Sequence, residues 1–402
     1  MIGLVGLSCF GQPPTFYRDV LPILQNHCQE CHRAGEMAPM SLAAYAETRP
    51  WARAIAEQVG AGKMPPWFAD PCCGKFANDR SLSTAERETL LQWANGGAPA
   101  GDSHDAPPPR EWTSGWNLPS PDLILKMPKA YAVPAAGAVE YQYFAVPTNF
   151  TEDRWVTGVE VKPGYRKGVH HIVVYIREPG QTWQQAPTTS DILGLYTPGA
   201  SADVLPPGMA RLVKAGSELV FEIHYTPNGK RALDQSQVAM TFYKGAGLPD
   251  KRVLTLEMDN VTFRIPPGDR DYSVSVWGTL PNDALLLSML PHMHLRGKSF
   301  EYDLIHADGR PEVLLRVPKY DFYWQLSYKL AQPLPLKQGT RLDWIGHFDN
   351  SKRNPRNPDP TKEVGYGHQS WDEMLVGFFD VAVDPHLDKH AFFMREEKSN
   401  RR

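Results

Sequence analysis

The period of the apolar and polar positions changes about a quarter of the way along the chain. Several segments between residues 16 and 100 have apolar residues at the 3.6-residue spacing of amphipathic helices. The clearest, S-T-A-E-R-E-T-L-L-Q-W-A, opens with Ser83 and Glu86, the residue types of a helix capping box, and two glycines follow its end. We therefore predict a small all-α domain over residues 16–103.

Beyond this region the spacing switches to the two-residue alternation of half-buried strands. Runs such as W-V-T-G-V-E-V and Y-S-V-S-V-W recur with the turn signals P-G and A-D-G between them. Many short strands without intervening helices are typical of sandwiches and barrels. The segments Y-F-A-V-P and T-F-R-I-P-P-G each precede a pair of histidines, which indicates a repeated unit. We predict two all-β, jelly-roll-like sandwiches over 122–261 and 262–402, after a Pro-rich linker over 104–121.

Composition excludes two classes of partner. The 402 residues carry a formal net charge of -3, without a basic run ahead of the C-terminal tail, so we expect no nucleic acid partner. No stretch reaches the roughly 18 apolar residues that a membrane-spanning helix needs. The chain is therefore expected to have no membrane span.

The N-terminus and the cysteines bear on processing and compartment. Residues 1–15 begin M-I-G-L-V-G-L-S-C-F-G, and we interpret them as a leader remnant or a disordered segment, with Cys9 as a candidate lipid anchor. All five cysteines lie in the first 73 residues, and an odd count excludes a fully paired disulfide framework. We expect Cys72 and Cys73 to be two ordinary thiols, with a vicinal disulfide between them as the alternative.

One motif in the helical region points to haem. Cys28-Gln-Glu-Cys31-His32 is C-x-x-C-H, in which two thiols attach to the haem vinyl groups and the histidine is the proximal iron ligand. A zinc half-site and a redox C-x-x-C pair are the alternatives. We predict one covalent haem c at this motif.

A methionine is the expected distal ligand of the haem. Met64 lies in K-M-P-P-W, where two prolines stiffen the turn, and Met37 and Met40 are its competitors. The segment 16–103 resembles a small cytochrome c domain. Because covalent haem attachment takes place outside the cytoplasmic membrane, we expect a periplasmic or secreted protein.

Five histidines gather at three predicted strand ends. His170 and His171 open one strand, His224 ends another, and His292 and His294 close a third. Residues i and i+2 of a strand share a face, whereas adjacent residues point to opposite faces. To share an ion, the H-H pair therefore needs a bulge, a strand end, or one ring that coordinates through its other nitrogen. Imidazole-rich sets without carboxylate suit zinc or copper.

The ordered pattern H-H, H-Y-T, H-M-H-L-x-G-K and D-E-M is similar to that of the copper type II, ascorbate-dependent monooxygenases. This family includes the peptidylglycine α-hydroxylating and dopamine β-monooxygenases, and the resemblance covers about residues 122–385. It implies one copper on the first three histidines and a second copper on His292, His294 and Met374. It also implies hydroxylation of a C–H bond with dioxygen, each copper supplying one electron.

The resemblance also bears on substrate and reductant. Leu290, Val376 and Phe378 stand where the peptide-hydroxylating members bind a substrate carboxylate and its surroundings, so we expect a small apolar substrate instead. The electron donor is expected to be an ascorbate-like reductant or a redox protein, and the haem is a candidate relay. An electron-transfer or copper-binding protein without turnover, and a zinc-dependent hydrolase, are the alternatives.

Other polar and aromatic segments have simpler interpretations. Tyr320 to Gln325 is predicted to be an aromatic strand. The turn-rich segment 349–360 is interpreted as a structural loop or a lid. His347 and His368 flank it, and we expect either surface positions or a place beside the second copper.

Overall fold

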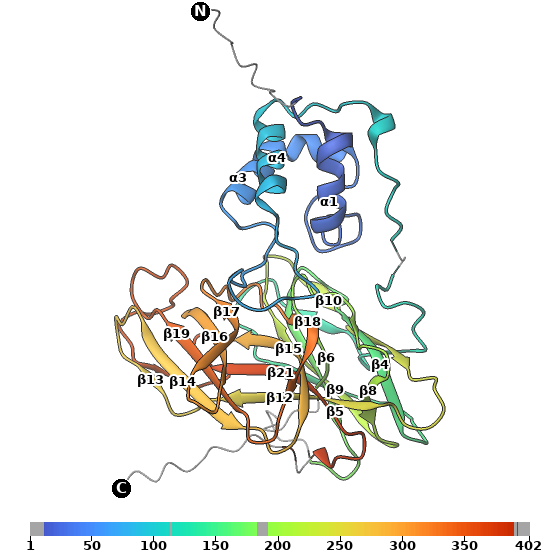
Figure 1. Ribbon diagram of the computed structural model, residues 1–402, viewed down its shortest axis with the longest axis vertical. Helices are drawn as coiled ribbons and strands as arrows, with labels where there is room; N and C mark the ends of the chain where they lie inside the picture. The colour runs from blue at the N-terminus through green and yellow to red at the C-terminus, as the bar shows by residue number, and fades with distance from the viewer. Residues whose placement is uncertain (1–11, 113–114, 183–191, 390–391, 393–402) are drawn as a thin grey trace, which may run out of the picture. The chain divides into compact units, whose positions relative to one another are not determined.

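The computed structural model describes residues 12–112, 115–182, 192–389 and 392. It divides into two compact units: unit 1 comprises Met1–Trp67 and Arg80–Trp112, and unit 2 comprises Phe68–Asp79 and Thr113–Arg402 (Figure 1). Residues 1–11, with Cys9, lie outside the described part of the chain. Within that part no helix is long and apolar enough to cross a membrane.

Unit 1 contains the helices of the described chain. They are η1 (Phe16–Val20), α1 (Leu21–His27), α2 (Tyr45–Thr48), η2 (Arg49–Trp51), α3 (Ala52–Gly60), α4 (Thr84–Asn95) and η3 (Ser103–Asp105). Phe16, Leu90 and Trp93 are fully buried in one apolar cluster. The predicted capping box of α4 is confirmed, because Ser83 Oγ accepts from Glu86 N and the Glu86 carboxylate accepts from Ser83 N. The helices thus lie where the sequence predicts them.

Unit 2 is built from strands, and one long sheet runs through it. This sheet contains, in order, β1 (Leu123–Lys126), β11 (Gln237–Phe242), β4 (Arg154–Lys162), β8 (Met209–Val213), β12 (Lys251–Asp259), β21 (Val376–Val383), β15 (Ala284–His292) and β18 (Tyr328–Leu336), with β7 (Asp203–Val204) beside β4. One four-stranded sheet contains, in order, β3 (Gln142–Pro147), β9 (Glu218–Tyr225), β5 (Val169–Arg177) and β6 (Ile192–Tyr196). A second four-stranded sheet contains β14 (Tyr272–Thr279), β19 (Arg341–Phe348), β16 (Gly297–Ile305) and β17 (Pro311–Val317). Two short strand pairs are also present: β10 (Ala232–Asp234) with β2 (Tyr131–Val133), and β13 (Arg264–Ile265) with β20 (Val364–Gly365).

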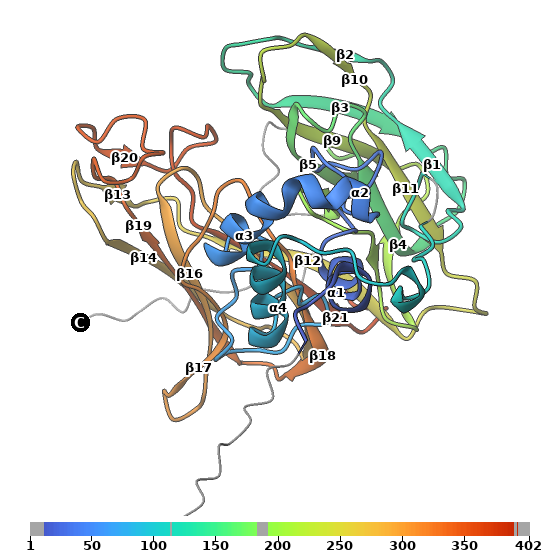
Figure 2. The same ribbon diagram turned by 90° about the horizontal axis from the view of Figure 1, so that it is seen from above.

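Each half of the long sheet packs against one four-stranded sheet, so the prediction of β-sandwiches is confirmed (Figure 2). In the first sandwich Val156 of β4 and Phe221 of β9 belong to one buried core. In the second, the Trp344 ring of β19 lies 5.5 Å from the Phe379 ring of β21. These contacts join the two layers of each sandwich.

The two sandwiches are joined along the long sheet. β12 pairs with β21 from Arg252 to Asp259, whereas only Lys251 and Arg252 pair with β8. The predicted boundary after residue 261 assigns β12 to the first sandwich, but its pairing makes it a strand of the second. The sequence could not show this, because strand pairing between distant segments leaves no local signal.

A buried ion cluster lies where the two halves of the long sheet meet. Arg211 of β8 pairs with Asp203 at 2.9 Å and with Asp380 of β21 at 3.2 Å. Lys329 of β18 pairs with Asp203 at 2.8 Å. Since Arg211 is almost fully buried, its charge depends on these carboxylates. The cluster therefore fixes strands of both sandwiches to one another.

Segment 68–79 belongs to unit 2 although it interrupts the predicted helical domain. Asp70 N donates to Arg316 O at 2.8 Å, and Ala77 N donates to Lys329 O at 2.8 Å. The segment thus adds backbone hydrogen bonds to β17 and β18, which lie about 240 residues later in the chain. The chain therefore passes from unit 1 to unit 2 after Trp67, returns to unit 1 after Asp79, and passes to unit 2 again after Trp112.

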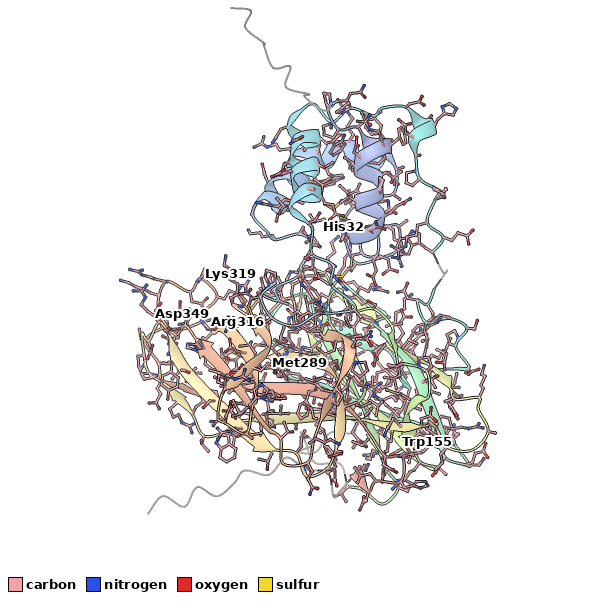
Figure 3. All side chains as sticks on the ribbon, in the orientation of Figure 1. His32, Trp155, Met289, Arg316, Lys319 and Asp349 are labelled. Atoms are coloured by element: carbon pink, nitrogen blue, oxygen red, sulfur yellow. A yellow bond between two sulfur atoms is a disulfide. The ribbon has the colours of Figure 1, made fainter. Side chains whose placement is uncertain are left out.

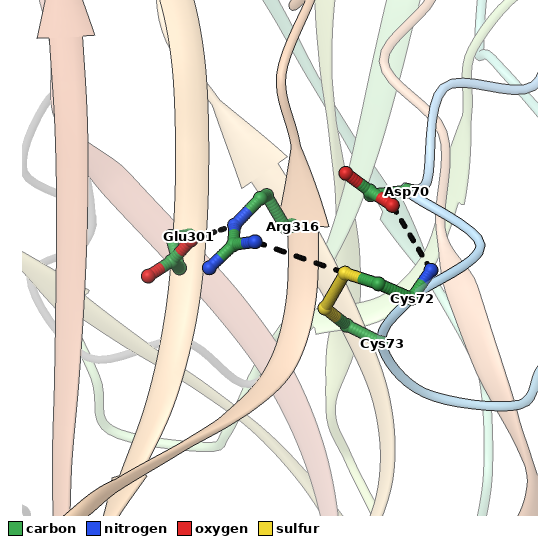
Figure 4. The surroundings of a disulfide bond; sticks show 5 residues. All are labelled: Asp70, Cys72, Cys73, Glu301 and Arg316. Carbon is green, nitrogen blue, oxygen red and sulfur yellow. Dashed lines mark hydrogen bonds and ion pairs between the residues drawn. A yellow bond between two sulfur atoms is a disulfide. The ribbon is translucent and has the colours of Figure 1, made fainter.

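The prediction that Cys72 and Cys73 are free thiols is wrong, because a disulfide joins them (Figure 4). The Asp70 carboxylate accepts from Cys72 N at 2.9 Å and holds the turn that brings the two side chains together. Arg316 donates to Cys72 Sγ at 3.7 Å and also binds Glu301.

The Pro-rich stretch predicted as a linker is anchored at both ends. The Arg33 guanidinium lies 4.1 Å from the centroid of the Trp112 ring, within unit 1. In unit 2 the Glu160 carboxylate accepts from Leu118 N at 2.8 Å. Described residues at both ends of this stretch therefore contact a compact unit.

Candidate metal centre

Three of the predicted histidines meet where β5 pairs with β9. His171 lies opposite His224, and the register shifts between Val169 and His171, so His170 occupies a bulge. A bulge is one of the three arrangements that the sequence allows here. It lets adjacent histidines turn toward the same ion. Nδ1 of His170 lies 3.0 Å from Nδ1 of His171, and a ligand nitrogen of each of the three histidines lies within 4.8 Å of the others.

The electrostatics of this first histidine set fit a metal ion. Burial lowers the pKa of His170 to about 3 and that of His224 to about 4, and it lowers the pKa of His171 well below the usual value. The rings are therefore neutral, which is the form that binds a cation. His170 Nε2 and His224 Nδ1 are buried without a hydrogen-bond partner. Such orphaned nitrogens are costly unless an ion or a proton donor satisfies them.

The second histidine set lies at the end of β15. His292 is the last residue of the strand and pairs with Val376 of β21, and its ring lies 5.3 Å from that of His294. Continuing this register by two residues would place Met374 opposite His294. Both ring nitrogens of His294 are buried without a well-formed hydrogen bond, although the Asp372 backbone lies close to the ring, and burial lowers its pKa well below the usual value. These three residues therefore also fit a metal ion that takes imidazole and thioether ligands.

Two residues that the sequence analysis missed hold this second set. Gln325 Oε1 lies 2.9 Å from His292 Nδ1, so this nitrogen is the donor and Nε2 is the free one. The fully buried Glu373 carboxylate accepts from His294 N at 3.0 Å and from Arg296 N at 2.6 Å. Burial raises the pKa of Glu373 to about 8. Its place beside Met374 in D-E-M is the one signal that could have found it.

The two sets lie next to one another. The rings of His171 and His292 are 6.2 Å apart. Phe322 stacks on His170 at 4.5 Å and meets His294 edge-on at 6.2 Å. The prediction of a strand over Tyr320 to Gln325 is wrong, because these residues form a loop between β17 and β18. Their side chains cover the histidines instead of alternating across a sheet.

A cavity of about 490 Å³ opens beside both sets. His171, His292 and Met374 contribute to its lining. The apolar residues singled out from the sequence as the wall of the substrate pocket line it too; they are Leu290, Val376 and Phe378. One wall of the cavity is therefore apolar and faces the candidate ligands.

A different wall of the cavity is acidic, which the sequence analysis did not foresee. Glu222, Glu257 and Asp259 line it, and the described lining contains no lysine or arginine. Tyr143 and Tyr175 form hydrogen bonds with Glu222. Burial raises the pKa of Glu222 to about 7 and that of Glu257 to about 8. The cavity therefore has an apolar wall and an acidic wall.

The C-x-x-C-H motif forms a turn directly after α1. Cys31 N and His32 N both donate to Cys28 O, at 3.1 and 2.9 Å. Both cysteines are free, and burial raises the pKa of Cys28 to about 12. His32, labelled in Figure 3, has a buried Nδ1 without a partner. Two reduced thiols beside an orphaned imidazole nitrogen fit covalent haem attachment.

The three candidate methionines differ in their surroundings. Met40 packs against the same apolar cluster as Cys28, and its backbone forms a hydrogen bond with the His32 ring. Met64 lies in the loop that follows α3, and Met37 lies in the turns after the motif. The assignment of Met64 as distal ligand stays a prediction.

The remaining polar segment divides between surface and site. His347 Nδ1 lies 3.1 Å from the Asp271 carboxylate at the surface, whereas His368 lines the cavity. Asn350, in the segment 349–360, is fully buried and donates to neighbouring backbone carbonyls. This agrees with the interpretation of the segment as a structural loop.

Comparison with known proteins adds little to this picture. No protein-family model and no curated protein matches the chain. Among solved structures, the major capsid protein P2 of bacteriophage PM2 is 10% identical, with 66% of this chain and 99% of that chain covered and a TM-score of 0.32. A chain of the Broad Bean Stain Virus structure is 8% identical, with 65% of this chain and 88% of that chain covered and a TM-score of 0.28. At such TM-scores the likeness supports no conclusion about function.

Proposed function

We propose that the chain is an exported, haem- and copper-dependent monooxygenase that hydroxylates a C–H bond of a small substrate. The observation that supports this most is the meeting of five neutral, largely buried histidines in two adjoining sets, from which His171 and His292 line one cavity together with Met374. Four of the ring nitrogens in these sets are buried without a well-formed hydrogen bond. Buried polar nitrogens without hydrogen bonds destabilise an apolar core, whereas coordination to two metal ions would satisfy them.

The chemistry of the donor sets favours copper. The three imidazoles of the first set would hold copper in either oxidation state, as an electron-storing centre requires, and the thioether of Met374 would favour Cu(I) in the second. Bound copper supplies one-electron chemistry on dioxygen. The overall reaction consumes substrate R–H, dioxygen, two electrons and two protons and yields R–OH and water. Gln325 fixes the His292 ring, and Glu373 fixes the backbone of His294.

The residues that line the cavity are the basis for the proposed substrate class. Leu290, Val376 and Phe378 would hold an apolar part next to the ligands His292 and Met374. The acidic wall would bind a group that donates hydrogen bonds or carries positive charge. We therefore extend the expected apolar substrate to a small compound that is apolar at one end and a donor at the other.

The haem motif defines the proposed electron supply and compartment. Cys28 and Cys31 would hold one haem c covalently, with His32 as proximal ligand and Met64 as distal ligand. Electrons would come from an ascorbate-like reductant or a redox protein, directly or through the haem. Export to the periplasm or the medium is supported by the disulfide between Cys72 and Cys73, since disulfides persist in oxidising compartments.

The test is reductant-dependent incorporation of oxygen. The full chain, loaded with haem and copper, is incubated with ascorbate, isotopically labelled dioxygen and a panel of small amphiphilic compounds. We expect labelled hydroxylated product, and none in His292→Ala or in zinc-loaded protein. Copper binding without product would indicate an electron-transfer or copper-binding protein. Product formation by water addition in the zinc form would indicate a hydrolase.

A further inference from the structure

One loop touches both histidine sets and also reaches the surface. It follows β17 and runs from residue 318 to 327. Phe322, which is 5% exposed, stacks on His170 with an interplanar angle of 19° and adjoins His294. Tyr323, which is 46% exposed, has its ring 5.5 Å from Phe322 and 6.0 Å from His170. An unbroken series of ring contacts therefore leads from solvent to a candidate ligand.

The exposed ring is held in a defined position. The Arg356 guanidinium lies 5.0 Å from the centroid of Tyr323 and pairs with Asp321 at 2.8 Å. The Asp321 carboxylate also accepts from Tyr323 N at 3.0 Å. A free surface tyrosine would sample several rotamers, whereas these contacts keep this ring against Phe322. The position suits a contact that must be made repeatedly in the same geometry.

We propose that Tyr323 and Phe322 form the route by which electrons reach copper at the first histidine set. This rests on the proposed function, because it needs copper at these histidines. A one-electron donor at Tyr323 loses one electron, and Cu(II) held by His170 and its partners becomes Cu(I). No bond to either ring forms or breaks. Aromatic rings in contact couple an electron donor to an electron acceptor better than an empty space or solvent of the same length does. We therefore expect most of the electrons to reach the copper by this short route.

The test follows copper reduction instead of turnover. The copper-loaded full chain is mixed anaerobically with excess ascorbate, and the loss of the Cu(II) paramagnetic resonance signal is timed by freeze-quenching. We expect Tyr323→Leu to lower the rate constant by about tenfold or more, and Tyr323→Phe, which keeps the ring, to retain it. The matched control is Trp277→Leu, whose ring is likewise covered by a guanidinium, that of Arg341 at 4.3 Å. It should leave the rate unchanged.

The outcomes separate the route from the function. Tyr323→Leu should keep its copper content and its Cu(II) spectrum, since Tyr323 is not a ligand. An unchanged reduction rate in this variant overturns the route while the proposed function stands. A chain that binds no copper refutes both. In a second arm the haem is reduced beforehand and its oxidation is followed. Slowing in Tyr323→Leu in both arms shows that haem and ascorbate share the route, and slowing in the ascorbate arm alone limits it to external donors.

Discussion

Replacing Gln325 with methionine tests how the second metal site is organised. In the native protein His292 Nδ1 donates to Gln325 Oε1 at 2.9 Å, and this bond leaves Nε2 free toward the cavity. Methionine has similar volume but cannot accept this bond. The buried Nδ1–H then lacks a strong acceptor, at a cost of about 1–3 kcal/mol. We expect roughly 10- to 100-fold weaker copper binding at this site, as for other groups that orient metal-bound histidines.

The assay is competition for Cu(I) with a chelator of known affinity. One equivalent of copper should be removed more easily from Gln325→Met, while the other equivalent keeps its affinity. Gln325→Glu retains an acceptor and should bind copper close to the native level. Gln235→Met is the matched control, because Gln235 donates to the Met127 carbonyl at 2.8 Å, away from the histidines. Native affinity for both coppers in Gln325→Met would refute the role of this hydrogen bond.

Three further predictions concern stability and are measured by denaturant unfolding of metal-free protein. Arg211→Ala removes the buried cation that Asp203 and Asp380 share, leaving Asp203 with Lys329 alone, and should lower the free energy of unfolding by up to about 3–5 kcal/mol; a loss below that of a surface arginine would contradict this. Burial opposes ionisation of Asp203, but the charges of Arg211 and Lys329 outweigh it and lower its pKa. The ionised Asp203 should therefore contribute its full stabilisation above the unfolded pKa near 3.8, and the free energy of unfolding should fall as the pH drops below that value. Asp203→Asn should make the free energy of unfolding less dependent on pH in this range. Burial raises the pKa of Glu257 from 4.5 to about 8, so stability should fall as the pH rises between these values, and Glu257→Gln should reduce that fall. Parallel pH profiles in variant and native protein would contradict either assignment.

The features that the sequence predicted well are those fixed by local chemistry. The capping box at Ser83 follows from four consecutive residues, and the bulge at His170 follows from the need of adjacent histidines to share a face. The apolar cavity wall at Leu290 and Phe378 was expected from the resemblance to the copper monooxygenases, and both residues line the cavity. The first two inferences needed only the residue and its near neighbours.

The features that the sequence did not predict depend on contacts between distant segments. The segment that contains Phe322 and Gln325 was predicted to be an aromatic strand, because a loop rich in aromatic residues has the same composition as such a strand. Glu222 and Glu257 meet only through the stacking of β9 and β12 around the cavity. Segment 68–79 joins unit 2 by bonds to strands far along the chain, and no periodicity in the segment itself reveals that.

The measurement that tests the central proposal most directly is the metal content of the purified chain and of two variants. We predict two coppers per chain in the native protein and one in either His171→Ala or His294→Ala. The absorption spectrum of the covalent haem should stay the same in all three. Zinc in place of copper, or a variant that loses both coppers or neither, would contradict the assignment of two separate ligand sets.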